Sequence, residues 1–233
     1  MLYRDDEKME FVTTHVGEQL DEFLARQVDR PAAERAIAGA VQYVAAVNRA
    51  DACDVEFRVP EYVARILAGL EHCTEEQRAS FWSRLPGLRM VVVELGARWT
   101  HRRLREGAGM TDLHISNLAL DTDGRIAMFD FDHFRPHYNL NYLLSYISVT
   151  LGWAMPQRWQ HLPAYLDAQA ETCEGWEPEL YAYGKIACHT TKLLDRYLPE
   201  TVGKPPAVPS TTQTDVERAI EQVERIAEGV LSG

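Results

Sequence analysis

Three polar residues near the middle of the chain have the types and the spacing that phosphoryl transfer needs. Asp112 precedes Asn117 by five positions, and Asp130 follows a short strand–turn–strand segment. A carboxylate can orient an attacking hydroxyl and accept its proton, while an amide oxygen and a second carboxylate can hold Mg²⁺ on nucleotide phosphates. All of these are hard oxygen donors, which Mg²⁺ prefers. We therefore expect a metal–phosphate site at these three residues.

The sequence also predicts the element that brings them together. Residues 118–120 are apolar and strand-like, residues 121–124 read Asp-Thr-Asp-Gly, and residues 125–129 return as a second strand. Gly124 stands where a tight turn needs a positive φ. A hairpin of this kind would return Asn117 and Asp130 to neighbouring places. The alternative is that the polar residues are only turn and cap residues, which explains 121–124 but not three metal-competent side chains at this spacing.

The same residues resemble the motif of a known family. Asp112-Leu113-His114, followed by Asn117 and then by Phe129-Asp130-Phe131-Asp132, resembles the catalytic core of the aminoglycoside phosphotransferase and choline kinase family, which has a protein-kinase-like fold. By position, the resemblance implies that Asp112 is the catalytic base and that Asn117 and Asp130 are metal ligands. Asp132 matches the family's frequent second acidic residue and is a further candidate ligand.

The resemblance also implies ligands and an activity. Mg²⁺ and ATP, or another nucleoside triphosphate, would be the cofactors, and a small-molecule hydroxyl would accept the phosphoryl group. Residues 9–12 followed by Gly17 are similar to the family's segment between its two lobes. On that likeness, backbone groups at Glu10, Val12 and Thr13 would meet the adenine, and residues 1–16 would form a short β-hairpin and linker like the end of a kinase N-lobe.

Two departures from the family pattern leave alternatives open. Met110-Thr111 stands where the family has His-Gly before the catalytic aspartate. A kinase N-lobe has a Gly-rich phosphate loop and a strand lysine paired with a helix glutamate, and neither precedes Met9. The chain is then an enzyme with a minimal C-lobe, an enzyme whose N-lobe comes from a partner chain or a second copy in a homodimer, or a non-catalytic pseudokinase-like binding protein.

Hydrophobic periodicity predicts helices for most of the remaining chain. The expected helices cover 18–28, 31–49, a segment opening at Pro60, a segment after the capping box Thr74–Gln77, 88–105, 139–153, 157–172, 177–198 and 215–230. Residues 51–59 are expected to be a connection and 201–213 a loop. The fold class for 17–233 is thus mainly α with short β-hairpins, a protein-kinase-like C-lobe whose catalytic hairpin lies at 111–132.

The composition of the chain argues against several classes of function. The chain has 24 basic and 35 acidic residues and a formal net charge of −11, so it lacks the basic surface that neutralises nucleic-acid phosphates. It has no run of about 18 apolar residues and no signal-like N-terminus, so we expect no membrane span and a cytoplasmic protein. The four cysteines form no CxxC pair and match no zinc motif.

Overall fold

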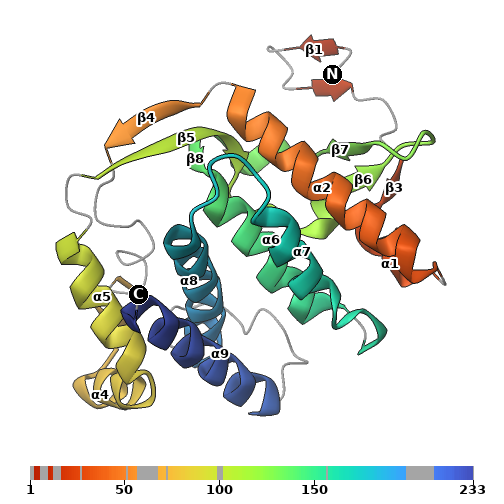
Figure 1. Ribbon diagram of the computed structural model, residues 1–233. Coiled ribbons are helices and arrows are strands. Elements are labelled where there is room, and N and C mark those ends of the chain that lie inside the picture. The colour runs from red at the N-terminus through yellow and green to blue at the C-terminus, as the bar shows by residue number, and fades with distance from the viewer. Residues whose placement is uncertain are drawn as a thin grey trace.

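Helices make up most of the structure, and small antiparallel sheets accompany them (Figure 1). The computed structural model describes residues 3–5, 10–12, 17–26, 28–50, 52–56, 68–71, 73–98, 102–155, 157–197 and 213–232. The prediction of a mainly α fold with short β-hairpins is confirmed for this part of the chain. No helix among these residues has both the length and the apolar character to cross a membrane.

The helices differ in length from six residues to about six turns. They are α1 Leu20–Ala25, α2 Arg30–Ala50, α4 Glu75–Arg84, α5 Pro86–Arg98, α6 Leu140–Ala154, α7 Leu162–Ala170, α8 Pro178–Tyr197 and α9 Gln213–Ser232. Single 3₁₀ turns lie at Ile115–Asn117, Phe131–His133 and Gln157–Trp159.

The strands form three sheets in the described residues. They are β1 Tyr3–Asp5, β2 Glu10–Val12, β3 Glu18–Gln19, β4 Cys53–Glu56, β5 Arg103–Met110, β6 Leu118–Leu120, β7 Ile126–Met128 and β8 Phe134–Asn139. Their orders are β1-β2, β3-β6-β7 and β4-β5-β8, and every pair is antiparallel. The first of these is the hairpin expected near the N-terminus.

Helix α2 forms because its apolar residues recur at helical spacing and face the core. Ile37, Val41 and Val44 are all buried, and they make one stripe along the helix. Asp29 caps the first turn, since its Oδ1 accepts a hydrogen bond from the Ala32 backbone N at 2.7 Å. The predicted helix over 31–49 is therefore confirmed and is slightly longer than expected.

Helix α6 packs against α2, α7 and α8 and carries much of the core that supports the β6–β7 hairpin. Its residues Leu143, Leu144 and Ile147 are almost fully buried. Asn139 caps its start by accepting a hydrogen bond from the Asn141 N at 2.9 Å, and donates from Nδ2 to the Arg105 carbonyl at 3.1 Å. The beginning of α6 is therefore attached directly to strand β5.

The prediction of a helix over 88–105 is wrong in its second half. Helix α5 ends at Arg98, and the arginine-rich segment belongs to β5. There, exposed Arg103 and Arg105 alternate with buried Leu104, which is the period of two of a strand. The predicted connection over 51–59 likewise contains β4, which pairs with β5.

A buried amide joins this sheet to α2. Asn48, at the end of α2, donates from Nδ2 to the Ala108 carbonyl at 3.1 Å and to the Tyr138 carbonyl at 2.9 Å. These carbonyls lie at the register shift between β5 and β8. Gly107 makes this close approach feasible, because a Cβ there would lie 1.6 Å from the Asn48 carbonyl oxygen.

A second clamp holds α1 near the loop that precedes β6. Arg158 donates from Nη2 to the carbonyls of Leu24, Ala25 and Arg26, and Trp159 donates from Nε1 to the Leu24 carbonyl at 2.7 Å. These contacts satisfy carbonyls at the end of α1, which have no partner inside a helix. As a result α1 is held where it contacts the 3₁₀ turn at 115–117.

Other predicted elements differ at their ends. Residues 18–19 form β3 instead of starting a helix, because they pair with 119–120 of β6. The segment 157–172 divides into a 3₁₀ turn and α7. The capping box before α4 is confirmed by reciprocal hydrogen bonds between Thr74 and Gln77 at 2.9 and 3.2 Å. Most of the helix expected from Pro60, and residues 201–212 of the expected loop, lie outside the described residues.

The contact between α6 and α8 contains a buried histidine. His189 of α8 accepts a hydrogen bond at Nδ1 from Trp153 Nε1 of α6 at 3.3 Å. Burial, with Lys185 nearby as a smaller cause, lowers the pKa of His189 from 6.5 to about 4. The native state therefore holds this imidazole neutral, while an unfolded chain would protonate it near its usual pKa.

We expect His189 to make the protein less stable as the pH falls. Its contribution is fully present above the unfolded pKa of 6.5 and is lost as the pH approaches about 4. Between pH 7 and pH 5 it should lower the free energy of unfolding by about 2 kcal/mol. Urea unfolding of wild type and His189→Gln at both pH values measures this. The variant should lose less stability on acidification, and exposed His137→Gln serves as the matched control. Equal acid sensitivity in wild type and H189Q would contradict the assignment.

Candidate functional site

The site is built on the β6–β7 hairpin, which the sequence predicted. Leu118 pairs with Met128 and Leu120 pairs with Ile126. The turn is held by Asp121, whose Oδ1 accepts hydrogen bonds from the backbone N of Asp123 and of Arg125, both at 2.8 Å. Gly124 has φ +76°, as the turn prediction requires. Local side-chain chemistry thus fixes the register of the two strands.

Asn117 joins the Asp112 loop to the open end of this hairpin. Its side chain is buried, and its Nδ2 donates to the Asp112 carbonyl at 3.0 Å. Its own carbonyl accepts from the Phe129 backbone N at 3.1 Å, so Asp130 is the next residue beyond that bond. With the Asn117 Nδ2 bound to the loop, its Oδ1 is the atom that can serve as a metal ligand.

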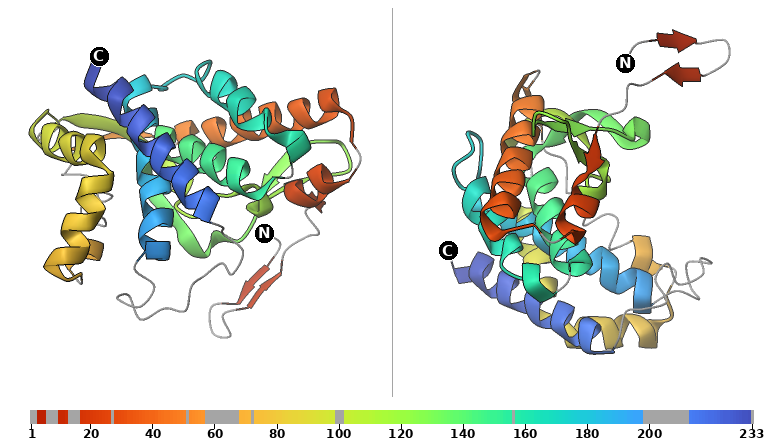
Figure 2. Two further views of the ribbon diagram at one scale, coloured as in Figure 1. Left: turned by 90° about the horizontal axis from the view of Figure 1, so that it is seen from below. Right: turned by 90° about the vertical axis from the view of Figure 1, so that its right-hand side faces the viewer.

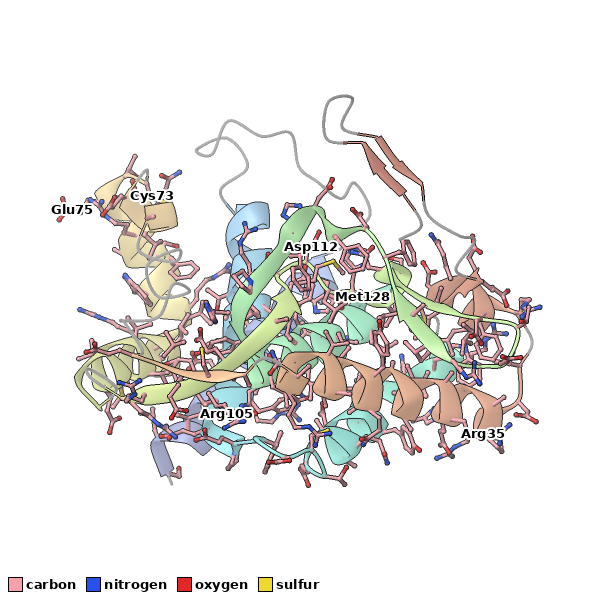
Figure 3. The ribbon with its side chains drawn as sticks, turned by 90° about the horizontal axis from the view of Figure 1, so that it is seen from above. Arg35, Cys73, Glu75, Arg105, Asp112 and Met128 are labelled. Atoms are coloured by element: carbon pink, nitrogen blue, oxygen red, sulfur yellow. The ribbon has the colours of Figure 1, made fainter. Side chains whose placement is uncertain are left out.

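A second connection holds the Asp112 loop from the other side. The Thr111 backbone N donates to the His133 carbonyl at 3.1 Å, directly beyond the pairing of Met110 with Phe134 in β5 and β8. The segment containing Asp130 and Asp132 is therefore attached to the segment containing Asp112. Figure 3 labels Asp112 and Met128, which lie together in the central part of the molecule. The backbone thus brings together all the predicted catalytic and metal-binding segments.

The Asp112 carboxylate has a different neighbour at each oxygen. Oδ1 accepts a hydrogen bond from Tyr146 OH at 2.7 Å, and Oδ2 lies 3.9 Å from His114 Nε2. The ring of His114 is itself hydrogen-bonded through Nδ1 to Ser116 Oγ. The Asp112 side chain is 46% exposed, so a solvent molecule or a substrate hydroxyl can reach it.

Tyr146 is a site residue that sequence reasoning missed. It lies on α6, far along the chain from Asp112, and no motif or spacing connects the two. Burial raises the pKa of Tyr146 well above its usual value, and the hydrogen bond to Asp112 raises it further. The phenol therefore stays protonated and acts as a donor to the carboxylate.

Asp130 has a strained backbone. Its φ and ψ are 62° and 67°, and among the described residues it is the one residue other than glycine with a positive φ. An L-residue in the left-handed region costs free energy, and such strain gathers at functional sites. The side chain is exposed, as is that of Asp132 in the following 3₁₀ turn. Beside them, Phe131 and Phe134 form an exposed edge-to-face pair with ring centroids 5.9 Å apart.

The donor set at this end of the hairpin fits Mg²⁺. Asn117 offers an amide oxygen, and Asp130 and Asp132 offer carboxylates, so every candidate ligand is a hard oxygen donor. The described part of the chain contains no group of three or more His, Cys, Asp or Glu side chains that could hold a metal by themselves. Mg²⁺ in nucleotide sites is bound by one or two carboxylates together with phosphate oxygens, and the binding of Mg²⁺ by Asn117, Asp130 and Asp132 stays a prediction.

The expected adenine contacts lie on the N-terminal hairpin. Glu10 and Val12 belong to β2, where they pair with Asp5 and Tyr3 of β1, while Thr13 lies outside the described residues. Figure 2 shows this hairpin standing away from the helical body in both views. The adenine contact of Glu10, Val12 and Thr13 therefore stays a prediction.

An open cavity of about 260 Å³ lies elsewhere, between α4 and α9. Its lining residues are Glu76, Gln77, Ser80, Phe81, Arg84, Leu85 and Ile220. Figure 3 labels Glu75, at the start of α4, at one side of the molecule and well away from Asp112. None of the lining residues belongs to 111–132, so the cavity is separate from the candidate site.

Replacing Asp130 by glycine should stabilise the fold. Glycine adopts positive φ without steric cost, so Asp130→Gly should raise the free energy of unfolding by about 0.5–1 kcal/mol. Asp130→Ala keeps the strained φ and should give no such gain. Asp132→Gly, at a position with no positive φ, is the matched control and should lower stability. Urea unfolding of the three variants measures this, and a loss of stability in D130G would contradict the strain.

No family model matches the chain, and no curated protein matches it either. The resemblance to the aminoglycoside phosphotransferase and choline kinase family stays a prediction, whose specific part is the motif at 112–132 and whose weaker part is the segment from residue 9 to Gly17.

Proposed function

We propose that this chain is a kinase-like phosphotransferase that moves a phosphoryl group from a nucleoside triphosphate to a hydroxyl of a small molecule. The observation that supports the proposal is the convergence of Asp112, Asn117 and Asp130 at the open end of one hairpin. That convergence depends on hydrogen bonds from Asn117 to the Asp112 loop and from Phe129 to Asn117. The protein-kinase-like C-lobe is part of the same proposal, and a mainly helical body carrying this hairpin is consistent with it.

In the proposed reaction Asp112 acts as the base. Its Oδ1 is occupied by Tyr146, so Oδ2 is the oxygen that can receive the proton of the acceptor hydroxyl. As that proton moves to Asp112, the hydroxyl oxygen forms a bond to the terminal phosphorus. The bond from that phosphorus to the bridging oxygen breaks, and the nucleoside diphosphate leaves with the bridging oxygen. Partial exposure of Asp112 leaves room for the acceptor.

Asn117, Asp130 and Asp132 would hold Mg²⁺ through their side-chain oxygens. When bound, the ion supplies positive charge that offsets the phosphate oxygens. The left-handed backbone of Asp130 turns the chain sharply between β7 and the following 3₁₀ turn, so that Asp130 and Asp132 follow the hairpin closely. Since the protein offers few ligands, phosphate oxygens would complete the coordination.

A second candidate function is a subunit or pseudokinase-like binding protein whose nucleotide-binding lobe comes from another chain. The observation that favours it is the β1–β2 sheet, which has only two strands in the described residues. A two-stranded hairpin by itself is marginally stable in water. A partner chain, or a second copy of this chain, could add strands to it and complete a nucleotide site.

Thermal stability should respond to Mg²⁺ and nucleotide together. Binding to the native state raises the melting temperature by mass action, and the incomplete protein ligand set predicts little response to Mg²⁺ alone. We expect a rise with Mg²⁺–ATP in the wild type and its loss in Asp130→Asn. Asp123→Asn, in the exposed turn of the same hairpin, is the matched control and should keep the rise. No nucleotide-dependent shift in the wild type would contradict nucleotide binding by the isolated chain.

Asp112→Asn should separate chemistry from binding. The amide can still accept the Tyr146 hydrogen bond, but it cannot accept a proton, so turnover should fall by about 10²–10⁴-fold. The Mg²⁺–ATP shift should remain. Coupled detection of nucleoside diphosphate with a panel of hydroxyl acceptors measures this. Wild-type activity in D112N would remove Asp112 from its role, whereas binding without turnover in the wild type would favour the second candidate function.

A further inference from the structure

The hydrogen bond from Tyr146 makes the two carboxylate oxygens of Asp112, the proposed base, different from each other. Tyr146 OH donates to Oδ1 at 2.7 Å, a distance typical of a strong O–H···O bond. Oδ2 has His114 Nε2 as a neighbour at 3.9 Å, which is beyond hydrogen-bond range. The Asp112 carboxylate therefore has one committed oxygen and one that can still accept a hydrogen bond.

The donor, Tyr146, is held by a helix that packs in the core of the molecule. Tyr146 lies in the middle of α6, between buried Ser145 and Ile147. Its carbonyl accepts a hydrogen bond from Thr150 Oγ1 at 2.8 Å, and α6 packs against three other helices. The phenol position is therefore set by the core and not by the loop that carries Asp112.

The donor also keeps its proton. Burial and the adjacent carboxylate both raise the pKa of Tyr146, so the phenol is neutral at any working pH. It can donate to Asp112, and it does not take the proton that the carboxylate receives. A partner of this kind fixes the carboxylate's orientation without becoming a second base.

The helical body contains a second hydrogen bond from a tyrosine to an aspartate, but that aspartate has different neighbours. Tyr181 OH donates to Asp167 Oδ1 at 2.7 Å. Ser148 Oγ also donates to that Oδ1 at 2.6 Å, and Lys185 Nζ pairs with Oδ2. Every oxygen of Asp167 is thus occupied, as in a structural junction between α6, α7 and α8. Asp112 differs because its carboxylate is half-exposed and its Oδ2 remains available.

We propose that Tyr146 is a positioning residue, which holds the Asp112 carboxylate so that Oδ2 faces the acceptor hydroxyl. This inference rests on the proposed function. It also specifies the side of approach, because the acceptor then meets Asp112 on the side of His114 and not on the side of α6. Without the phenol, the carboxylate of a half-exposed aspartate would rotate about its broad, roughly two-fold χ2 and would present either oxygen.

Steady-state kinetics of Tyr146→Phe tests this role. Loss of orientation at the reacting oxygen should lower kcat by about 10- to 100-fold and leave the KM for Mg²⁺–ATP within about twofold. Tyr181→Phe is the matched control, since it removes the same bond to a carboxylate outside the site. It should lower stability to urea and leave kcat unchanged. A wild-type kcat in Y146F, or an equal loss of kcat in both variants, would overturn the positioning role.

A spectroscopic measurement separates failure of this inference from failure of the proposed function. In protein labelled with ¹³C at tyrosine Cζ, the Tyr146 resonance is identified by its absence in Y146F. Asp112→Ala should move that resonance and leave the Tyr181 resonance in place. A moved resonance with no turnover in the wild type would overturn the proposed function and the positioning role with it, while the bond itself stands. An unmoved resonance would overturn the inference even if the enzyme is active.

Discussion

The arrangement of the candidate site depends on one buried amide, that of Asn117. Its side chain bonds the carbonyl of Asp112, and its backbone carbonyl receives the N–H that precedes Asp130. A buried amide without partners costs about 1–3 kcal/mol, so these bonds strongly favour one arrangement of the two loops. Because both loops are bonded to this residue, Asn117 fixes the geometry of the site together with the bond from Thr111 to His133.

The surrounding fold holds in place the elements on either side of the Asn117 amide. Asn48 fixes the β5–β8 sheet to α2 through two carbonyls, and Asn139 attaches the start of α6 to β5. The loop of Asp112 leaves from β5, and Tyr146 approaches from α6, so both partners of the Tyr146–Asp112 bond start from elements that are already joined. Three buried asparagines thus position the site. Asn48 holds the sheet, Asn139 holds the start of α6, and Asn117 holds the Asp112 loop.

Sequence reasoning succeeded where structure is determined locally. The β6–β7 hairpin follows from the turn chemistry of Asp121 and Gly124, and α2 follows from its apolar stripe. It failed for β5, because the length and arginine-rich end of the segment 88–105 also suit a helix, and the true partners of β5 are β4 and β8, which are distant in sequence. The Tyr146–Asp112 bond was missed for the same reason, since only tertiary packing brings α6 to that loop.

Under the proposed function, the ligands at this end of the hairpin would make the binding of Mg²⁺ and of nucleotide depend on each other. Asp112, Asp130 and Asp132 place three carboxylates on two adjoining loops. Asp130 is also the residue whose backbone is strained. Under the proposed function, a divalent cation bound by Asn117, Asp130 and Asp132 would keep unused coordination positions, because the protein supplies few ligands. A polyphosphate provides the missing oxygens, and its own negative charge needs the same cation. Cation and nucleotide should therefore bind cooperatively, each removing a cost that the other faces alone.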